Sequence, residues 1–160
     1  QQTWAYCRTD PRFNSAEGDF AGVDQLIMFN GIKNAYDTVS SRYGCEIIPS
    51  GQAVQNWRRE APEHVKSYTP EELAAFEYPD LPMQSGDVVG KYWWEKQNGK
   101  MVMVSDHIHL NDRGEYLQAC VWYLKLFDGL VEDIKFVPEN MENDFAAFCQ
   151  HCAAEAVAKD

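Results

Sequence analysis

The sequence predicts an α/β fold with a parallel sheet, because helical and extended segments alternate along its first half. In residues 23–43 the apolar side chains recur at intervals of three and four, which is the spacing of an amphipathic helix. A short β-branched run at residues 45–48 predicts a strand, and a Pro-Ser-Gly turn connects it to a second short helix at residues 52–59. Folds of this class bind their ligands at the carboxyl ends of the strands.

The ends of the first predicted helix carry residues that are typical of helix termini. Asp24 lies in the first turn, where its negative charge complements the helix dipole, and Gly44 stands where a left-handed C-terminal residue is expected. Ahead of this helix, residues 3–7 predict an extended segment, followed by a loop rich in small and polar residues.

The composition predicts a packed domain and argues against two classes of partner. Of the 160 residues, 45% are hydrophobic and 13% aromatic, which is unlike a disordered chain. The chain has 14 basic and 25 acidic residues, a net charge of −11, and its largest basic cluster is the pair Arg58-Arg59. Nucleic-acid phosphates and anionic membrane surfaces would be repelled, so we expect no nucleic-acid partner and no membrane partner.

Residues 60–100 differ from their surroundings and read as an insertion made of a loop and a hairpin. Prolines break the first part of this stretch, which leaves one short helix at residues 70–76. Two strands then flank the pair Asn98-Gly99, at residues 92–96 and 100–104, and this is the strongest short-range signal for a β-hairpin.

Two helices are predicted after the hairpin. Asn111 can cap the first of them, with Asp112 in its first turn. Residues 116–127 contain only two polar side chains, so we expect this helix to be buried on most sides. A final amphipathic helix is predicted at residues 139–159.

The segment Asp106-His107-Ile108-His109 is the best candidate for a functional site. Two residues separate Asp106 from His109, so the two side chains can meet across a single turn. The carboxylate would then accept the imidazole N–H, fix its tautomer and stabilise the imidazolium, which makes His109 a candidate general base. The alternative is a polar turn in which Asp106 bonds backbone amides and His109 packs at a helix start.

Residues 106–120 resemble the last conserved block of the SGNH (GDSL-like) hydrolases, in which Asp-x-x-His precedes an Asn, a Gly and a buried helix. The resemblance is closest to the bacterial carbohydrate-esterase-like branch. There the segments Trp4-Ala5-Tyr6 and Ile47-Ile48-Pro49-Ser50-Gly51-Gln52-Ala53 and a closing Pro-led helix also have counterparts.

This resemblance implies a three-layer α/β/α sandwich of flavodoxin-like type with a parallel sheet. It also implies a Ser–His–Asp site that deacylates carbohydrate esters, in which His109 matches the general base and Asp106 the residue that orients it. A periplasmic or extracellular location is a further implication of the family.

The sequence departs from the family pattern in its nucleophile. The Gly-Asp/Asn-Ser block and the Gly and Asn oxyanion donors of the family have no counterpart here. We therefore expect residues 1–160 to be the C-terminal portion of one such domain, without its first strands. The serine would come from sequence outside this chain, or from a complementing chain, and the chain alone would be inactive, because acyl transfer needs nucleophile, base and oxyanion donors in one place.

The alternatives to a nucleophile from outside the chain are a serine within it, Ser50 or Ser105, and a domain that has lost catalysis. Ser50 follows a predicted strand and precedes a helix, as a nucleophile elbow does, but the G-x-S-x-G pattern is absent. Ser105 adjoins Asp106 and is expected to point away from His109. A domain of the same fold that binds carbohydrate without catalysis explains the missing nucleophile equally directly.

Other residues give weaker signals for ligands. His107, Trp93 and Trp94 are candidates for substrate binding, although adjacent strand residues point to opposite faces, so only one of the two tryptophans can face a given ligand. Asp106, His107, His109 and Asp112 offer metal-binding atoms, but no second cluster accompanies them, so we expect no metal and no cofactor.

The five cysteines show no disulfide or metal-binding framework. Cys149 and Cys152 lie on one helix without a partner pair, which favours small buried thiols on its apolar face.

Overall fold

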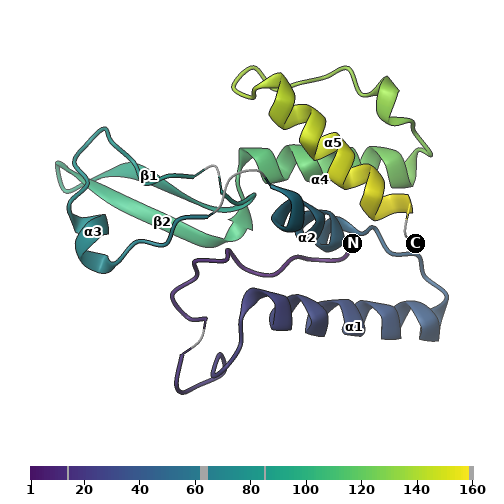
Figure 1. The fold of residues 1–160 in the computed structure, drawn as a ribbon, viewed down its shortest axis with the longest axis horizontal. Helices are drawn as coiled ribbons and strands as arrows, with labels where there is room; N and C mark the ends of the chain where they lie inside the picture. Colours follow the sequence, from purple (N-terminus) through teal and green to yellow (C-terminus); the bar gives the residue numbers. More distant parts are fainter. Residues whose placement is uncertain (14, 62–64, 85, 159–160) are drawn as a thin grey trace.

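The computed structural model describes residues 1–13, 15–61, 65–84 and 86–158 (Figure 1). Helices and strands follow one another in the order α1 (Gln25–Tyr43), α2 (Ser50–Glu60), α3 (Pro70–Ala74), β1 (Val89–Gln97), β2 (Lys100–Leu110), α4 (Asp112–Leu126), a 3₁₀ turn η1 (Val131–Asp133) and α5 (Asn143–Ala158). The hairpin β1–β2 extends from one end of the molecule, and α2, α4 and α5 lie together at the other.

The predicted parallel sheet and three-layer sandwich are wrong. The sheet that the described residues form is two-stranded and antiparallel, with order β1-β2. Residues 3–7 and 45–48 are extended without forming strands, and one backbone bond, from Gln2 N–H to the Ile48 carbonyl at 2.9 Å, joins the two regions. The run at residues 45–48 has only four residues, of which Glu46 is charged, and is too short to specify a strand by periodicity alone. For this reason the alternation of helical and extended segments led to a wrong prediction.

The predicted hairpin is confirmed, and it is longer than the sequence indicated. Asn98 and Gly99 form its turn with φ of 50° and 82°, as an Asn-Gly turn requires. Strand β2 continues to Leu110, so the segment Asp106-His107-Ile108-His109 lies in the strand and not in a separate loop. The ladder pairs Lys91 with Asp106 and Val89 with Leu110, which leaves three residues of β2 opposite Gly90 in a bulge.

Helices α2, α4 and α5 enclose the core. Trp57 of α2 is fully buried and lies 4.6 Å from the ring of Phe148 and 5.4 Å from that of Phe145, both in α5. Leu117 and Val121 of α4 fill the space beside them. Trp57 therefore belongs to the core and has no surface on which a ligand could bind.

Helix α1 lies along one edge of the molecule, away from α4 and α5 (Figure 1). Gly44 ends it with φ of 65°, so the predicted C-terminus is confirmed. The helix begins at Gln25, two residues later than predicted, and Asp24, which we expected in the first turn, is its N-cap and accepts the Ile27 N–H at 2.7 Å. Phe29 is its buried residue, whereas Leu26 and Ile27 are half exposed.

A buried ion pair joins the N-terminal segment to the start of the hairpin. Asp87 and Arg58 have side chains that are each 3% exposed, and Arg58 Nε lies 3.2 Å from Asp87 Oδ1. Arg58 also donates to the carbonyls of Ala5 and Tyr6 at 3.2 and 2.8 Å. Three separate segments of the chain thus depend on this pair.

The last two helices are confirmed with two corrections. Asn111 caps α4, as predicted, by accepting the Gly114 N–H at 3.2 Å. Residues 116–127 are not buried on most sides, because Trp122 and Phe127 are 41% and 75% exposed. The last helix begins at Asn143, four residues later than predicted, and the final residue of the predicted range lies outside the described residues.

The cysteines are free thiols, and four of the five are buried. Burial raises the pKa of Cys120 to about 11 and that of Cys152 to about 12, and it raises the pKa of Cys149 as well. These thiols stay protonated at neutral pH, so they pack as small apolar groups. Within the described residues, no helix is long and apolar enough to cross a membrane.

Candidate functional site

Asp106 and His109 form the hydrogen-bonded pair that their spacing predicted. His109 Nδ1 lies 2.7 Å from Asp106 Oδ2, and the His109 side chain is 76% exposed while that of Asp106 is 24% exposed. An ionised carboxylate can only accept a hydrogen bond, so in the neutral imidazole Nδ1 carries the hydrogen and Nε2 keeps its lone pair. Within residues 1–13, 15–61, 65–84 and 86–158, no hydrogen bond reaches Nε2, and the ring is largely exposed to solvent.

The bulge in β2 makes this contact possible. In a regular strand, residues three apart point to opposite faces, so Asp106 and His109 would not meet. The bulge turns the chain within this segment, and Asp106 Oδ1 accepts the backbone N–H groups of Ile108 and His109 at 2.7 and 2.8 Å. One carboxylate oxygen therefore shapes the backbone while the other orients the imidazole.

The N-terminal segment supports the bulge from the outside. Trp4 Nε1 donates to the Ile108 carbonyl at 2.9 Å, and the Cys7 N–H donates to the His107 carbonyl at 2.8 Å. These bonds satisfy carbonyls that the bulge removes from the β1–β2 ladder. The role of Trp4 was not predicted from sequence, since its partner lies 104 residues away.

Asn111 fixes the point where the bulge meets α4. While its side-chain oxygen caps the helix, its Nδ2 group donates to the carbonyls of Asp87 and Gly90 at 2.9 and 3.1 Å. This side chain is buried, and both ends of its amide are satisfied. The Asp106–His109 pair therefore lies between the capped start of α4 and the start of β1, which Asn111 holds in place.

The environment of Asp106 favours its charged form. Partial burial opposes ionisation, but the hydrogen bonds from the His109 ring and from the backbone N–H groups of His109 and Ile108 outweigh it. Together they lower the pKa of Asp106 from 3.8 to about 2. The carboxylate is ionised at neutral pH, as a residue that orients a general base must be.

This pKa shift predicts an acid-sensitive contribution to stability. Because the pKa of Asp106 is lower in the folded protein than in the unfolded chain, the contribution is fully present above pH 4 and is lost as the pH falls toward 2. With discount for solvent exposure, we expect about 1 kcal/mol. Carbon-13 NMR titration of the Asp106 carboxyl should show a midpoint near 2, and a midpoint near 4 would contradict the assigned hydrogen bonds.

Gly90 permits the bulge and cannot be replaced without strain. Its φ is 85°, and a Cβ atom there would lie 2.8 Å from the Asp106 carbonyl oxygen. We expect Gly90→Ala to lower the free energy of unfolding by about 2 kcal/mol, measured by urea denaturation, and to disturb the Asp106–His109 bond. Gly99→Ala is the matched control, because Gly99 has φ of 82° with no atom within 4 Å of an added Cβ. Equal losses in the two variants would show that the contact with Asp106 is unimportant.

The three predicted substrate-binding residues lie in different surroundings. Trp93 lines a cavity of about 540 Å³ together with Gln84, Lys91, Asn111 and Arg113, among others. Lys91 pairs with Asp106 in the β1–β2 ladder, so this cavity adjoins the Asp106–His109 pair. Neither Asp106 nor His109 lines the cavity itself. Trp93 is thus the residue best placed to contact a ligand.

Trp94 and His107 are engaged in packing. Trp94 Nε1 donates to the Asp80 carbonyl at 3.0 Å, and its ring meets that of Tyr78 edge-on at 6.1 Å. The His107 ring meets Tyr92 edge-on at 5.9 Å and does not join the Asp106–His109 pair. The expected division of the two tryptophans between opposite faces agrees with these different partners.

The alternative nucleophiles do not approach His109. Ser50 is 2% exposed at the start of α2, where its hydroxyl accepts from Gln1 Nε2 at 3.5 Å. Ser105 is exposed and pairs with Tyr92 across the hairpin. In the described part of the chain, no serine hydroxyl bonds the His109 ring.

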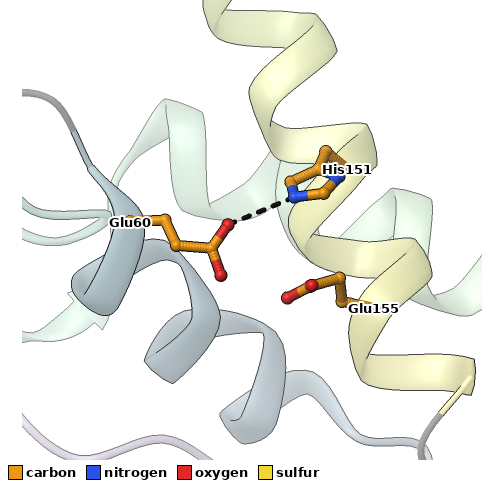
Figure 2. A group of neighbouring side chains, drawn as sticks. All are labelled: Glu60, His151 and Glu155. Carbon is orange, nitrogen blue, oxygen red and sulfur yellow. Dashed lines mark hydrogen bonds and ion pairs between the residues drawn. The ribbon is translucent and has the colours of Figure 1, made fainter.

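The structure brings together three metal-binding side chains that differ from those considered in the sequence analysis. Glu60, His151 and Glu155 converge where α2 meets α5 (Figure 2), and His151 Nε2 lies 3.1 Å from Glu60 Oε2. The four-residue spacing of His151 and Glu155 was a usable signal on a helix. The approach of Glu60 depends on tertiary packing and had no signal in the sequence.

A further cavity in the described residues lies apart from the Asp106–His109 pair. It has a volume of about 730 Å³ and runs along α4, where Tyr116, Tyr123, Ile134 and Phe136 line it. Neither Asp106 nor His109 lines this cavity.

No protein-family model and no curated protein matches the sequence. One solved structure that is similar is that of a DUF4886 family protein from Bacteroides uniformis ATCC 8492, with a TM-score of 0.65 and 23% sequence identity. The match covers 98% of this chain and 46% of that one, so the chain spans about half the length of the protein it resembles. At this identity the likeness concerns the fold alone.

Proposed function

We propose that this chain supplies the acid–base pair of an ester hydrolase of the SGNH type, acting on acylated carbohydrates. His109 is the general base and Asp106 orients it. The observation that carries the proposal is the 2.7 Å contact between His109 Nδ1 and Asp106 Oδ2, with both oxygens of Asp106 accepting hydrogen bonds. The proposal concerns the chemistry of this segment and does not depend on a parallel sheet.

In this proposal, His109 Nε2 removes the proton from a serine hydroxyl as the hydroxyl attacks the acyl carbon, and gives it to the sugar oxygen that leaves as the ester bond breaks. Nε2 then takes a proton from the water that attacks the acyl-serine and returns it to the serine oxygen, which releases the carboxylic acid. The exposure of the imidazole, at 76%, leaves room for a serine from a segment outside these 160 residues or from a complementing chain. The cavity beside Trp93 and Lys91 is suited to the sugar, because an aromatic face and polar groups together recognise carbohydrates.

The test is turnover of an acetylated sugar and of an aryl acetate by the full product of the gene that encodes this sequence. We expect hydrolysis that His109→Ala abolishes, together with labelling of a serine by a fluorophosphonate. Hydrolysis that persists in His109→Ala would reject the assigned base.

A second candidate is a carbohydrate-binding domain without catalysis. The Trp93 cavity favours it, as does the absence of a serine–His109 contact among the described residues. It predicts glycan binding that survives His109→Ala and is lost in Trp93→Ala, with no ester hydrolysed by any form of the protein. The secretion implied by the family resemblance remains part of the proposal in both cases.

A further inference from the structure

Three side chains that can bind a metal face one another between α2 and α5. Glu60 is the last residue of α2, and His151 and Glu155 lie one turn apart on α5. One ligand atom of each lies within 4.8 Å of the other two, and Figure 2 shows the three side chains pointing into the same space. None of them belongs to the Asp106–His109 pair.

We propose that Glu60, His151 and Glu155 form a binding site for Zn²⁺. One imidazole nitrogen and two carboxylate oxygens are ligands that zinc accepts in proteins, and three protein ligands leave a position for water. Mg²⁺ and Ca²⁺ prefer oxygen ligands in larger number, so the histidine favours zinc over these ions. The site would join the two helices and would be independent of the proposed hydrolysis.

The backbone that carries the three ligands is held firmly. Asn56 of α2 is fully buried and donates from Nδ2 to the Cys152 carbonyl of α5 at 3.1 Å. Trp57 and Phe148 pack across the same interface at 4.6 Å. The positions of α2 and α5 are therefore fixed beside the three ligands, so we expect the ligand atoms to reach a common ion by side-chain rotation.

A cation of the chain already lies between the two carboxylates. Arg59 Nη2 bonds Glu155 Oε2 at 2.8 Å and also bonds Glu60 Oε1. The two carboxylates are therefore arranged around one positive charge. The Arg59 side chain is 50% exposed, and exposed ion pairs of this kind contribute little to stability, so the guanidinium can move into water when a metal ion replaces it.

Competition with Arg59 gives the proposal a signature in two variants. His151→Ala removes a ligand and should weaken zinc binding by about tenfold or more. Arg59→Gln removes the competing cation, and should tighten binding several-fold. A zinc ion bound elsewhere on the protein would not respond to these two substitutions in opposite directions.

The experiment is calorimetric titration of the metal-free protein with zinc chloride, accompanied by thermal unfolding with and without zinc. We expect one Zn²⁺ per chain, a higher melting temperature with zinc, and no comparable heat with magnesium chloride. His109→Ala is the matched control, since among the described residues it removes a second histidine that contacts a carboxylate, and it should leave zinc binding unchanged. Unfolding curves of each metal-free variant establish that it is folded.

Four outcomes would overturn the proposal. Three of them are the absence of zinc binding, zinc binding that His151→Ala leaves intact, and zinc binding that Arg59→Gln weakens. The fourth is loss of zinc binding in His109→Ala, which would place the ion at Asp106 and His109 instead. Because none of these readouts measures ester hydrolysis, failure here leaves the proposed function untouched.

Discussion

Replacing His109 with alanine is expected to lower kcat/KM for an acetyl ester by about 10³-fold or more in the full product of the gene. The imidazole is the proposed proton acceptor, and nothing else among the described residues contacts Asp106 Oδ2 as it does. Since the ring is largely exposed, the substitution should change the free energy of unfolding by less than about 1 kcal/mol. Kinetics and urea denaturation on the same samples separate the two effects.

Asp106→Asn provides the complementary test. The amide keeps the shape of the carboxylate, but it can no longer hold the imidazole in the tautomer with hydrogen on Nδ1, so we expect a loss of about 10²-fold or more. His151→Ala is the control for removing a histidine elsewhere, and it should retain normal hydrolysis. Activity that survives Asp106→Asn would mean that the carboxylate has only a structural role in the bulge.

Replacing Asp87 with alanine is expected to lower the free energy of unfolding by about 3–5 kcal/mol. The substitution leaves Arg58 charged and buried without its carboxylate, and it removes the acceptor of the Val88 N–H at 2.8 Å. The Arg8 N–H, 3.2 Å from the second Asp87 oxygen, loses its acceptor as well. Equilibrium urea denaturation followed by circular dichroism measures the loss.

Two further variants sharpen this second prediction. Asp87→Asn keeps an oxygen acceptor but not the charge, so its free energy of unfolding should lie between that of the wild type and that of Asp87→Ala. Asp37→Ala breaks the exposed pair of Asp37 with Lys33 at 2.6 Å and should cost less than about 0.5 kcal/mol. A loss below about 1 kcal/mol in Asp87→Ala would show that Arg58 reaches water when its partner is removed.

Local signals in the sequence predicted the helices and the hairpin well. Asp24, Gly44, Asn98-Gly99 and Asn111 each act through bonds or dihedral angles within a few residues. The structure places Gly44, Asn98-Gly99 and Asn111 as expected, and it places Asp24 at the N-cap, just before the first turn in which we expected it. Such interactions are decided by neighbours in the chain, so their residues are sufficient to predict them.

The parallel sheet failed because strand pairing is not local. The run at residues 45–48 has strand propensity, but a strand forms only where a partner offers a ladder of hydrogen bonds, and here the Gln2 N–H supplies a single one. Spacing alone similarly predicted the contact of Asp106 with His109, whereas the bulge opposite Gly90 that permits it depends on register between two strands.

The clustering of Glu60 with His151 and Glu155 could not be predicted from the sequence either, because it too depends on contacts between distant residues. Only the pair on α5 has a fixed spacing, and Glu60 reaches it because Trp57 and Asn56 bring α2 against α5. Contacts between residues about 90 positions apart are set by packing of the core.

The burial of four of the five thiols leaves one cysteine accessible to labelling reagents. Cys45 is exposed directly after α1, whereas the other four cysteines are enclosed, and burial raises the pKa of each of those four. A maleimide dye or spin label added to the folded, unmodified protein will therefore attach at Cys45 without prior mutagenesis. A reporter at that position lies two residues beyond the end of α1 and senses the surroundings of that end of the helix in solution.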